Sequence, residues 1–306
     1  KHKICKILLV ILAIFLCVAF YELLGICVAY KKQPEVSNTT KKETKNGSWN
    51  ECSENTERAV IIEKNPEALL QRVRLIKNAK KEIILSTFAF QSDESGKLIL
   101  GALHDAADRG VHIRLLVDGM ESWIDMEGNP YFYGLSSHEN VEIKLYNKAN
   151  PLKPWKMMGR MHDKYLIADG KRYILGGRNT YNYFLGDFPG HKNYDRDVLV
   201  VCDEPEKENS VNQLSEYFET IWNQEDSGYF HNNKKLANRK SVKNAVLELQ
   251  NGYQKYFEEN KERICDTDYT DETFETEKIA LVSNPIHTGS KEPVVWYQLG
   301  ELMKNA

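Results

Sequence analysis

The chain opens with an apolar run over residues 7–30, in which Glu22 is the single charged side chain. Apolar side chains would cover every face of a helix over this run, which is unusual in a soluble protein. Its 24 residues are enough to cross the hydrocarbon core of a bilayer, which is about 30 Å thick. A cleaved signal peptide fits less well, because its apolar region would be shorter and followed by small residues at a cleavage site. The pattern therefore predicts a membrane anchor over residues 1–32.

The lysines on the two sides of the apolar run give opposite indications of which side of the membrane holds the rest of the chain. A short basic N-terminus before a large domain, here with Lys3 and Lys6, favours an extracytoplasmic domain. Lys31 and Lys32 directly after the run favour the opposite orientation under the positive-inside rule. We expect a single-pass protein with an extracytoplasmic domain, and the opposite orientation stays open.

Residues 33–58 are polar and show neither helical nor strand periodicity. Segments of this kind cannot bury enough apolar surface to fold on their own, and they commonly act as tethers. We expect a linker between the anchor and the globular part, with an ordered surface loop as the alternative for its second half.

From residue 59 to residue 228 the pattern alternates between helical periodicity and the short apolar runs of buried strands. Helices are expected over 65–81, 95–110 and 211–222, and strands over 82–90, 111–119, 141–147 and 196–203. Strands that alternate with helices predict an α/β sandwich built on a mixed sheet. The remainder, 229–306, predicts a helix over 244–257, a solvated acidic loop over 266–277 and a strand over 279–285.

The chemistry of the chain is concentrated between Met161 and Asn179. Apolar residues on both sides of Asp169-Gly170 predict a tight hairpin with this pair at the turn. Residues two apart on a strand share a face, so His162 and Lys164 are expected to project together. A histidine nucleophile or base, a fixed cation and an amide in one place are what phosphoryl transfer without a metal requires.

The spacing of these residues, H-x-K-x4-D-x6-G-G-x-N, resembles the H-K-D signature of the phospholipase D superfamily. The sequence is most similar to bacterial cardiolipin synthase-like members in R-M-H-D-K and G-G-R-N. Further similar segments lie at 93–98, 106–118 and 196–201, so the resemblance covers about residues 60–225. It implies a phospholipase D-like α/β fold and a phosphodiester as substrate.

The resemblance also implies roles for single residues. His162 would attack phosphorus to form a phosphohistidine, and Lys164 with Asn179 would hold the non-bridging oxygens. Asp197 would orient the histidine ring, with Asp195 as the competing candidate for that role. Asp169 belongs to the catalytic signature but is interpreted as a structural residue that pairs within the fold.

The glycine pair Gly176-Gly177 is expected to let backbone approach the substrate closely, as anion sites often require. Because side chains supply the cations, neither a metal ion nor a cofactor is expected at this site.

The anchor favours a phospholipid as substrate, since it places the site at a bilayer. We expect a phosphatidyltransferase or phospholipase whose partners are the bilayer and its lipids. The alternatives are a nuclease or another phosphodiesterase with a soluble substrate, and a tethered module that has lost catalysis. The formal net charge is −3 although residues 1–32 hold five lysines and one acid. The remainder is therefore acidic, and no nucleic acid partner is expected.

Superfamily members of this kind usually combine two H-K-D halves, and this chain holds one motif. Residues 302–306 repeat four of the five residues at 75–79, as if a second half began there. We expect the second half to lie in the same full-length chain. A homodimer that completes the site around a two-fold axis is the alternative.

The six cysteines include no C-x-x-C pair, so a zinc site is unsupported. Cys52 and Cys265 could form a disulfide in an oxidising compartment, whereas Cys202 lies in an apolar run and is expected to be buried.

Two further features are weighed between structural and functional roles. Asp118 follows a strand and is interpreted as a cap for the next turn, with a catalytic carboxylate as the alternative. Four aromatic residues near the motif could line a lipid-binding wall or pack in the core, namely Trp155, Tyr181, Tyr183 and Phe184.

Overall fold

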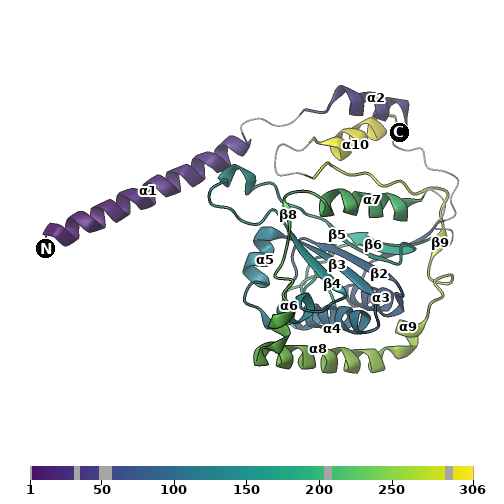
Figure 1. The fold of residues 1–306 in the computed structure, drawn as a ribbon. Helices are drawn as coiled ribbons and strands as arrows, with labels where there is room; N and C mark the ends of the chain where they lie inside the picture. The colour runs from purple at the N-terminus through teal and green to yellow at the C-terminus, as the bar shows by residue number, and fades with distance from the viewer. Residues whose placement is uncertain (1, 31–34, 48–56, 203–208, 287–291, 306) are drawn as a thin grey trace.

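The computed structural model describes residues 2–30, 35–47, 57–202, 209–286 and 292–305 (Figure 1). Within this part a nine-stranded sheet has the order β8-β4-β3-β2-β5-β6-β7-β1-β9. Strands β2, β3 and β4 run parallel to one another, and the other neighbouring pairs are antiparallel. The expected α/β fold with a mixed sheet is confirmed.

The strands are β1 (Glu57–Ile62), β2 (Glu82–Thr87), β3 (His112–Asp118), β4 (Val141–Tyr146), β5 (Lys164–Ala168), β6 (Arg172–Gly176), β7 (Asp197–Cys202), β8 (Ser227–Tyr229) and β9 (Phe274–Glu275). The helices are α1 (His2–Tyr30), α2 (Asn38–Asn46), α3 (Asn65–Asn78), α4 (Glu94–Asp108), α5 (Gly119–Asp125), α6 (Pro130–Ser136), α7 (Ser210–Trp222), α8 (Lys240–Glu259), α9 (Lys261–Cys265) and α10 (Val294–Asn305), with short 3-10 helices η2 (Pro154–Lys156) and η3 (Lys234–Asn238).

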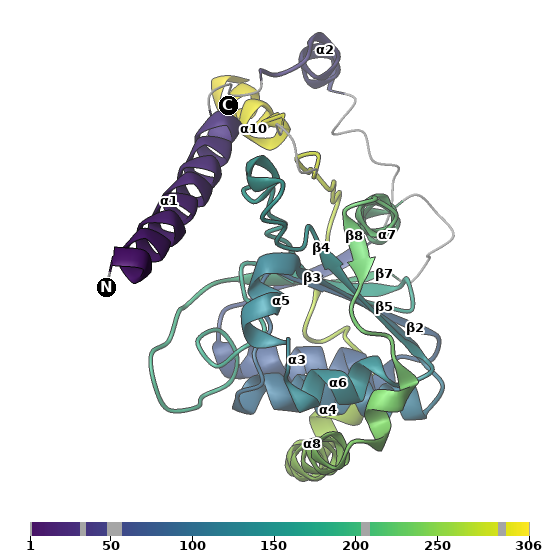
Figure 2. The ribbon, with the colours of Figure 1, turned by 60° about the vertical axis from the view of Figure 1, so that its left-hand side comes forward.

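Helices cover both faces of the sheet. Helices α3, α4, α6 and α8 lie on one face, and α7 lies on the other (Figures 1 and 2). Along β5, Leu166 and Ala168 are buried in the first layer, while Tyr165 and Ile167 are buried beside α7. Alternate residues of a strand point to opposite faces, so a strand covered on both sides must be apolar throughout, as the sequence pattern indicated.

The expected hairpin at Asp169-Gly170 is confirmed by the antiparallel pairing of β5 with β6. Both turn residues have positive φ angles, 55° for Asp169 and 62° for Gly170. Two consecutive residues with positive φ form the type I′ turn, whose twist matches that of the flanking strands. Gly170 adopts this conformation without steric cost.

The expected linker over 33–58 is corrected in two places. Residues 38–46 form helix α2, in which the hydroxyl of Ser37 accepts a hydrogen bond from the backbone N–H of Thr40 (3.1 Å). Gly47 ends the helix in the left-handed conformation. Caps at both ends stabilise a helix that hydrophobic periodicity does not reveal. In addition, β1 begins at Glu57, so the sheet starts two residues before the expected domain boundary.

The region after residue 228 also differs from expectation. Helix α8 buries Leu249 and Tyr253 in the same core as α4, so it belongs to the main helical layer rather than to a connector. The acidic loop is ordered, because the buried guanidinium of Arg74 pairs with Asp266 and Glu272.

Residues 279–285 form no strand. The backbone N–H of Leu281 instead donates to the side-chain oxygen of Gln213 (2.9 Å), and Leu281 packs beside α7. The apolar character that suggested a strand comes from this packing, which requires no pairing with the sheet.

Helix α1 is apolar enough between Lys3 and Val28 to cross a membrane, and apart from Gly25 no residue of this stretch is buried within the described structure. It fits the expected membrane anchor. Cys202 is buried as expected. Cys265 is an exposed free thiol in the described structure, and Cys52, the partner suggested for it, lies outside the described residues.

Candidate active site

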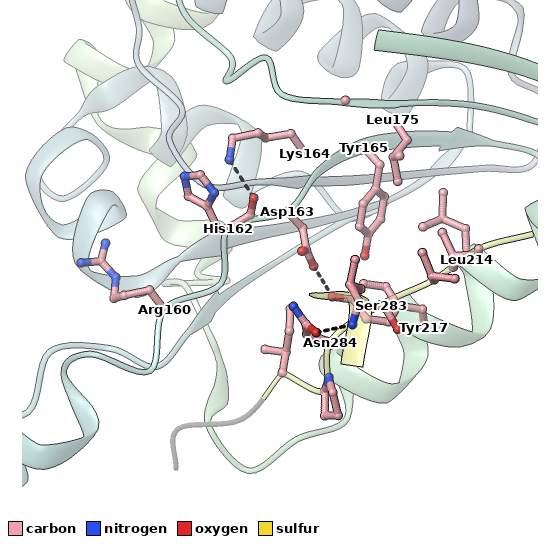
Figure 3. Close-up of a pocket in the computed structure, with 16 residues that line it drawn as sticks. Arg160, His162, Asp163, Lys164, Tyr165, Leu175, Leu214, Tyr217, Ser283 and Asn284 are labelled. Atoms are coloured by element: carbon pink, nitrogen blue, oxygen red, sulfur yellow. Dashed lines mark hydrogen bonds between the residues drawn. The ribbon is translucent and has the colours of Figure 1, made fainter. Parts of the chain in front are cut away.

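His162 and Lys164 lie at the start of the β5–β6 hairpin, and both line one cavity of about 330 Å³ (Figure 3). Lys164 is the first residue of β5 and pairs with Thr87 at the end of β2. His162 is exposed, whereas only 6% of Lys164 is accessible to solvent. The expectation that these two side chains project to one place is met in the geometry of this cavity.

Lys164 is a buried cation with little compensation. Burial lowers the pKa of its ammonium group to about 8, and the carboxylates of Asp163 and Asp195 oppose this shift. The ammonium also donates a hydrogen bond to a backbone oxygen, that of His162 (2.7 Å). A poorly solvated ammonium of this kind binds a phosphate oxygen more strongly than a surface lysine does.

Phe88, directly after β2, contacts the histidine through its ring. The two ring centroids lie 4.7 Å apart at an interplanar angle of 65°, an edge-to-face arrangement. The ammonium of Lys164 and the guanidinium of Arg160 lie 5.4 Å and 5.2 Å from the Phe88 ring centroid. Sequence reasoning missed Phe88, because its place at the site depends on the pairing of β2 with β5.

Asp118 fixes the chain immediately before His162. Its buried carboxylate accepts hydrogen bonds from Nε of Arg160 (2.8 and 2.9 Å) and from the backbone N–H of Met161 (3.1 Å). It also caps α5 by accepting from the backbone N–H of Met120 (3.0 Å). The expected cap is confirmed, and the same side chain aligns the segment that carries the histidine.

Asn179 is buried and tied to the end of β2. Its side-chain oxygen accepts a hydrogen bond from the backbone N–H of Ala89 (3.2 Å), the residue after Phe88. Thr180 continues this contact by donating its backbone N–H to the carbonyl oxygen of Ala89 (3.0 Å). Asn179 is thus tied to the residue that follows Phe88, it is not among the residues that line the cavity, and its expected contact with substrate oxygens stays a prediction.

Asp197 does not have the expected position beside the histidine ring. One of its carboxylate oxygens pairs with Arg72 of α3 (2.9 Å) and with Arg178 (3.2 Å). All three side chains are almost completely buried, and the other oxygen of Asp197 has no hydrogen-bond partner in the described structure. Buried arginines require a counter-charge, so Asp197 serves the core. This corrects the assignment of Asp197 as the residue that orients His162.

Asp195, the competing candidate, acts electrostatically on the ammonium group of Lys164. Its carboxylate opposes the lowering of the Lys164 pKa, which places its charge near that ammonium group. It is exposed, and a Cβ atom built on Gly177 would overlap it.

The two glycines are explained by packing. A Cβ atom on Gly176 would overlap the side chain of Asp197 and the carbonyl oxygen of Arg196, just as one on Gly177 would overlap Asp195. The glycine pair therefore makes room for residues 195–197. Gly176 also lines the cavity, so the expected approach of backbone to the substrate stays a prediction.

Asp169 lies at the far end of β5 from His162. Its carboxylate accepts hydrogen bonds from the backbone N–H groups of Lys80 (2.8 Å), Lys81 (2.7 Å) and Glu82 (3.0 Å). It anchors the hairpin to the loop between α3 and β2, as the structural interpretation proposed, and its place among the catalytic residues is corrected.

The C-terminal part of the chain forms a wall of the cavity that sequence reasoning did not foresee. Residues 281–286 and Val295 line it opposite β5, together with Leu214 and Tyr217 of α7 (Figure 3). The Tyr217 hydroxyl donates to the carboxylate of Asp163 (2.9 Å). Asn284 accepts a hydrogen bond from the backbone N–H of Val295 (3.0 Å), which joins the two C-terminal pieces.

The cavity lining holds charged groups of both signs beside the histidine. The charged lining residues are Arg160, Lys164 and Asp163, and the carboxylate of Asp163 accepts a hydrogen bond from Tyr217. Among the described residues no group of three or more histidine, cysteine or acidic side chains is arranged to hold a metal ion.

Comparison with known proteins identifies a matching family. A family model described as "Cardiolipin synthase, PLD-like domain" matches residues 72–222, which include the complete hairpin. The chain contains a phospholipase D-like domain. Its phospholipase D-like domain is of the cardiolipin synthase type, and members of this family are phosphodiesterases or phosphatidyltransferases.

Individual relatives match this domain. An uncharacterised protein of Helicobacter pylori strain J99 is 30% identical over 212 residues, covering 64% of this chain and 39% of the relative. Cardiolipin synthase C of Escherichia coli strain K12 is 30% identical over 154 residues, covering 46% of this chain and 31% of that enzyme. The solved structure of NucT from Helicobacter pylori matches with a TM-score of 0.45 and 17% identity, covering 57% of this chain and 99% of NucT. The chain spans about a third of the length of the curated relatives it matches.

Proposed function

We propose that this chain is a membrane-anchored phosphatidyltransferase or phospholipase that acts on a phospholipid phosphodiester through a phosphohistidine at His162. The observation that carries the proposal is the exposed His162 ring at a cavity that also holds the buried ammonium of Lys164. The match to the cardiolipin synthase family supports a lipid substrate, and so does the apolar helix α1.

The first step of the proposed reaction forms a P–N bond. A ring nitrogen of His162 attacks phosphorus, the bond from phosphorus to the leaving alcohol breaks, and that alkoxide takes a proton from a general acid. Lys164 stabilises the negative charge that builds on the non-bridging oxygens in the transition state. Arg160, held by Asp118, adds a second cation at the same cavity.

In the second step an acceptor hydroxyl attacks phosphorus, the P–N bond breaks, and the acceptor's proton passes to the base left by the first step. Water as acceptor gives hydrolysis, and a lipid alcohol gives transfer. We infer that Asp195 stabilises the charged histidine ring, because Asp197 is occupied by Arg72 and Arg178. The general acid is proposed to come from a second H-K-D half, in the same chain or in a dimer partner.

The chemistry at His162 can be tested without that acid. A p-nitrophenyl phosphodiester releases p-nitrophenolate, a stable anion that leaves without a proton. The chain, reconstituted with its helix α1, should release p-nitrophenolate and acquire a phosphohistidine. His162→Ala should abolish both. The exposed His191, which contacts Asn193 (3.0 Å), provides a matched His→Ala control that should retain them. Equal release by His162→Ala and the parent chain would contradict the proposal.

The substrate class requires a separate experiment. Phospholipid vesicles with labelled headgroups and labelled single-stranded DNA should be offered to the same preparation. Headgroup release that depends on His162, without cleavage of DNA, is the expected result, and mass spectrometry of the lipid products identifies the acceptor. Cleavage of DNA with no change in lipid would replace the proposal with a nuclease.

A further inference from the structure

The segment that precedes the active site, residues 148–158, rests against helix α1. The hydroxyl of Tyr21 donates to the carbonyl oxygen of Leu152 (2.8 Å). Gly25 faces Pro154 of η2 so closely that a Cβ atom at Gly25 would overlap the proline ring. Both structural views show this segment beside the C-terminal end of α1 (Figures 1 and 2).

These contacts set the depth of the segment relative to a bilayer. The apolar stretch of α1 that could cross a membrane ends at Val28. Tyr21 lies about two helical turns before that residue, which is about 10 Å along the helix axis. A loop that touches both Tyr21 and Gly25 therefore lies level with the outer part of the membrane when α1 spans it.

The side chains of the segment suit that depth. Leu152 is 77% exposed, Trp155 45% and Met158 43%, although all three are large and apolar. The stretch 148–158 also holds three lysines and no acidic residue. Tryptophan and lysine beside exposed apolar side chains are typical of the membrane interface, where the ring or aliphatic stem is buried and the polar end faces headgroups.

Helix α5 extends this surface. Trp123 is 67% exposed and Ile124 is 65% exposed. Trp123 lines a cavity of about 510 Å³ together with Lys148 and Pro151, which places α5 next to the segment. Large apolar side chains that are exposed together on neighbouring elements mark a contact with a membrane or a partner.

We propose that residues 148–158, together with Trp123 and Ile124, form a bilayer contact surface that inserts into the headgroup region beside α1. The contact with α1 is what favours lipid over a protein partner. Since Arg160 and His162 follow the segment directly, its insertion holds the mouth of the active site at the level of phospholipid headgroups. The inference rests on the membrane anchor of the proposed function and not on its chemistry.

Tryptophan quenching tests the surface independently of catalysis. The full chain is reconstituted into vesicles of phosphatidylcholine and phosphatidylglycerol, with and without bromine on the acyl chains near the glycerol. The emission lost in Trp155→Phe isolates the signal of Trp155, and Trp123→Phe does the same for Trp123. Each isolated signal should fall at least twofold in brominated vesicles. The signal of the buried Trp222, isolated in the same way, should not change.

Flotation of the vesicles separates the two ways in which the result could fail. If the chain floats with the vesicles but the isolated Trp155 and Trp123 signals are unquenched, the contact surface is wrong while the anchor stands. Protection of both residues from aqueous iodide without bromine quenching would mean that a protein covers the surface, and would also overturn the proposal. If the chain does not float, the anchor fails, and the contact surface fails with it.

Discussion

The ammonium of Lys164 donates a 2.7 Å hydrogen bond to the backbone carbonyl oxygen of His162. An ammonium group has three protons, so this bond leaves two of them for substrate oxygens. Because the acceptor belongs to the residue that carries the nucleophile, the ammonium group is held next to the backbone of that residue. The contact also means that Lys164 contributes to the conformation of the segment before β5.

Replacing Lys164 with methionine should lower activity and raise stability. The loss of charge at the transition state should cost about a thousandfold in kcat. The free energy of unfolding at pH 7 should increase by about 1 to 3 kcal/mol, because a buried charge is replaced by an apolar side chain of similar length. Denaturant unfolding followed by circular dichroism measures the second effect.

Lys171→Met is the matched control for this substitution, since Lys171 is exposed at the turn of the same hairpin. It should leave activity unchanged and alter the free energy of unfolding by no more than about 0.5 kcal/mol. If Lys164→Met destabilised the protein as a cavity-forming substitution does, burial would not be the cause of the lowered pKa.

Activity should fall as the pH rises through about 8. The pKa of Lys164 is lowered to about 8 by burial, so kcat/KM should show an alkaline limb near that pH. A bound phosphodiester favours the charged form, and the limb in kcat should therefore lie at higher pH. Lys164→Arg should remove the limb while lowering the rate, since arginine stays protonated. A limb that is unchanged in Lys164→Arg belongs to another group.

The same pKa has the opposite consequence for stability. The folded chain releases the Lys164 proton near pH 8, while the unfolded chain keeps it to about pH 10.4. Between these values the unfolded state binds more protons, so this group makes stability rise with pH. Activity and the Lys164 contribution to stability should thus diverge above pH 8, which paired rate and unfolding measurements can show.

Asparagine substitutions should separate the two acids after the glycine pair. Asp195→Asn should lower kcat by about a hundredfold or more with little change in stability, because its carboxylate is exposed beside the site. Asp197→Asn should lower the free energy of unfolding by about 3 to 5 kcal/mol, because Arg72 and Arg178 lose their counter-charge. The reverse pattern in rates and unfolding curves would restore Asp197 as the orienting residue.

Activity should persist in EDTA. The proposed mechanism assigns transition-state stabilisation to Lys164 and Arg160, so removal of divalent ions should leave the rate within about twofold. The measurement is the p-nitrophenolate assay after dialysis against chelator. Full loss of activity that a divalent ion restores would contradict the mechanism, though it would leave the fold unaffected.

The parts of the site that sequence could predict are those formed by neighbours in the chain. His162, Lys164 and the turn at Asp169-Gly170 belong to one hairpin, so strand geometry alone relates them. Phe88 and Asn284 reach the cavity region only through packing between segments far apart in sequence, for which a single sequence has no local signal.

The acids at 195 and 197 illustrate a second limit of sequence reasoning. They are two residues apart and chemically identical, and their different roles follow from the surroundings of β7. Asp197 pairs with Arg72 of α3, and this ion pair exists only because α3 packs against the sheet. The spacing within the motif contains no information about it.

The hydrogen bonds of Asp169 limit the motion of the hairpin that follows His162. Asp169 lies seven residue steps after His162, about 23 Å at strand rise. At its own end three backbone N–H groups hold it to the loop before β2 and to the start of β2. The hairpin is thus fixed by hydrogen bonds at its turn, which is the end away from the reaction. Loss of the hydrogen bonds of Asp169 would keep every reacting group present. It would increase the range of positions that the His162 side chain samples. Damage at Asp169 would therefore appear first in amide hydrogen exchange along β5 and only later in the rate.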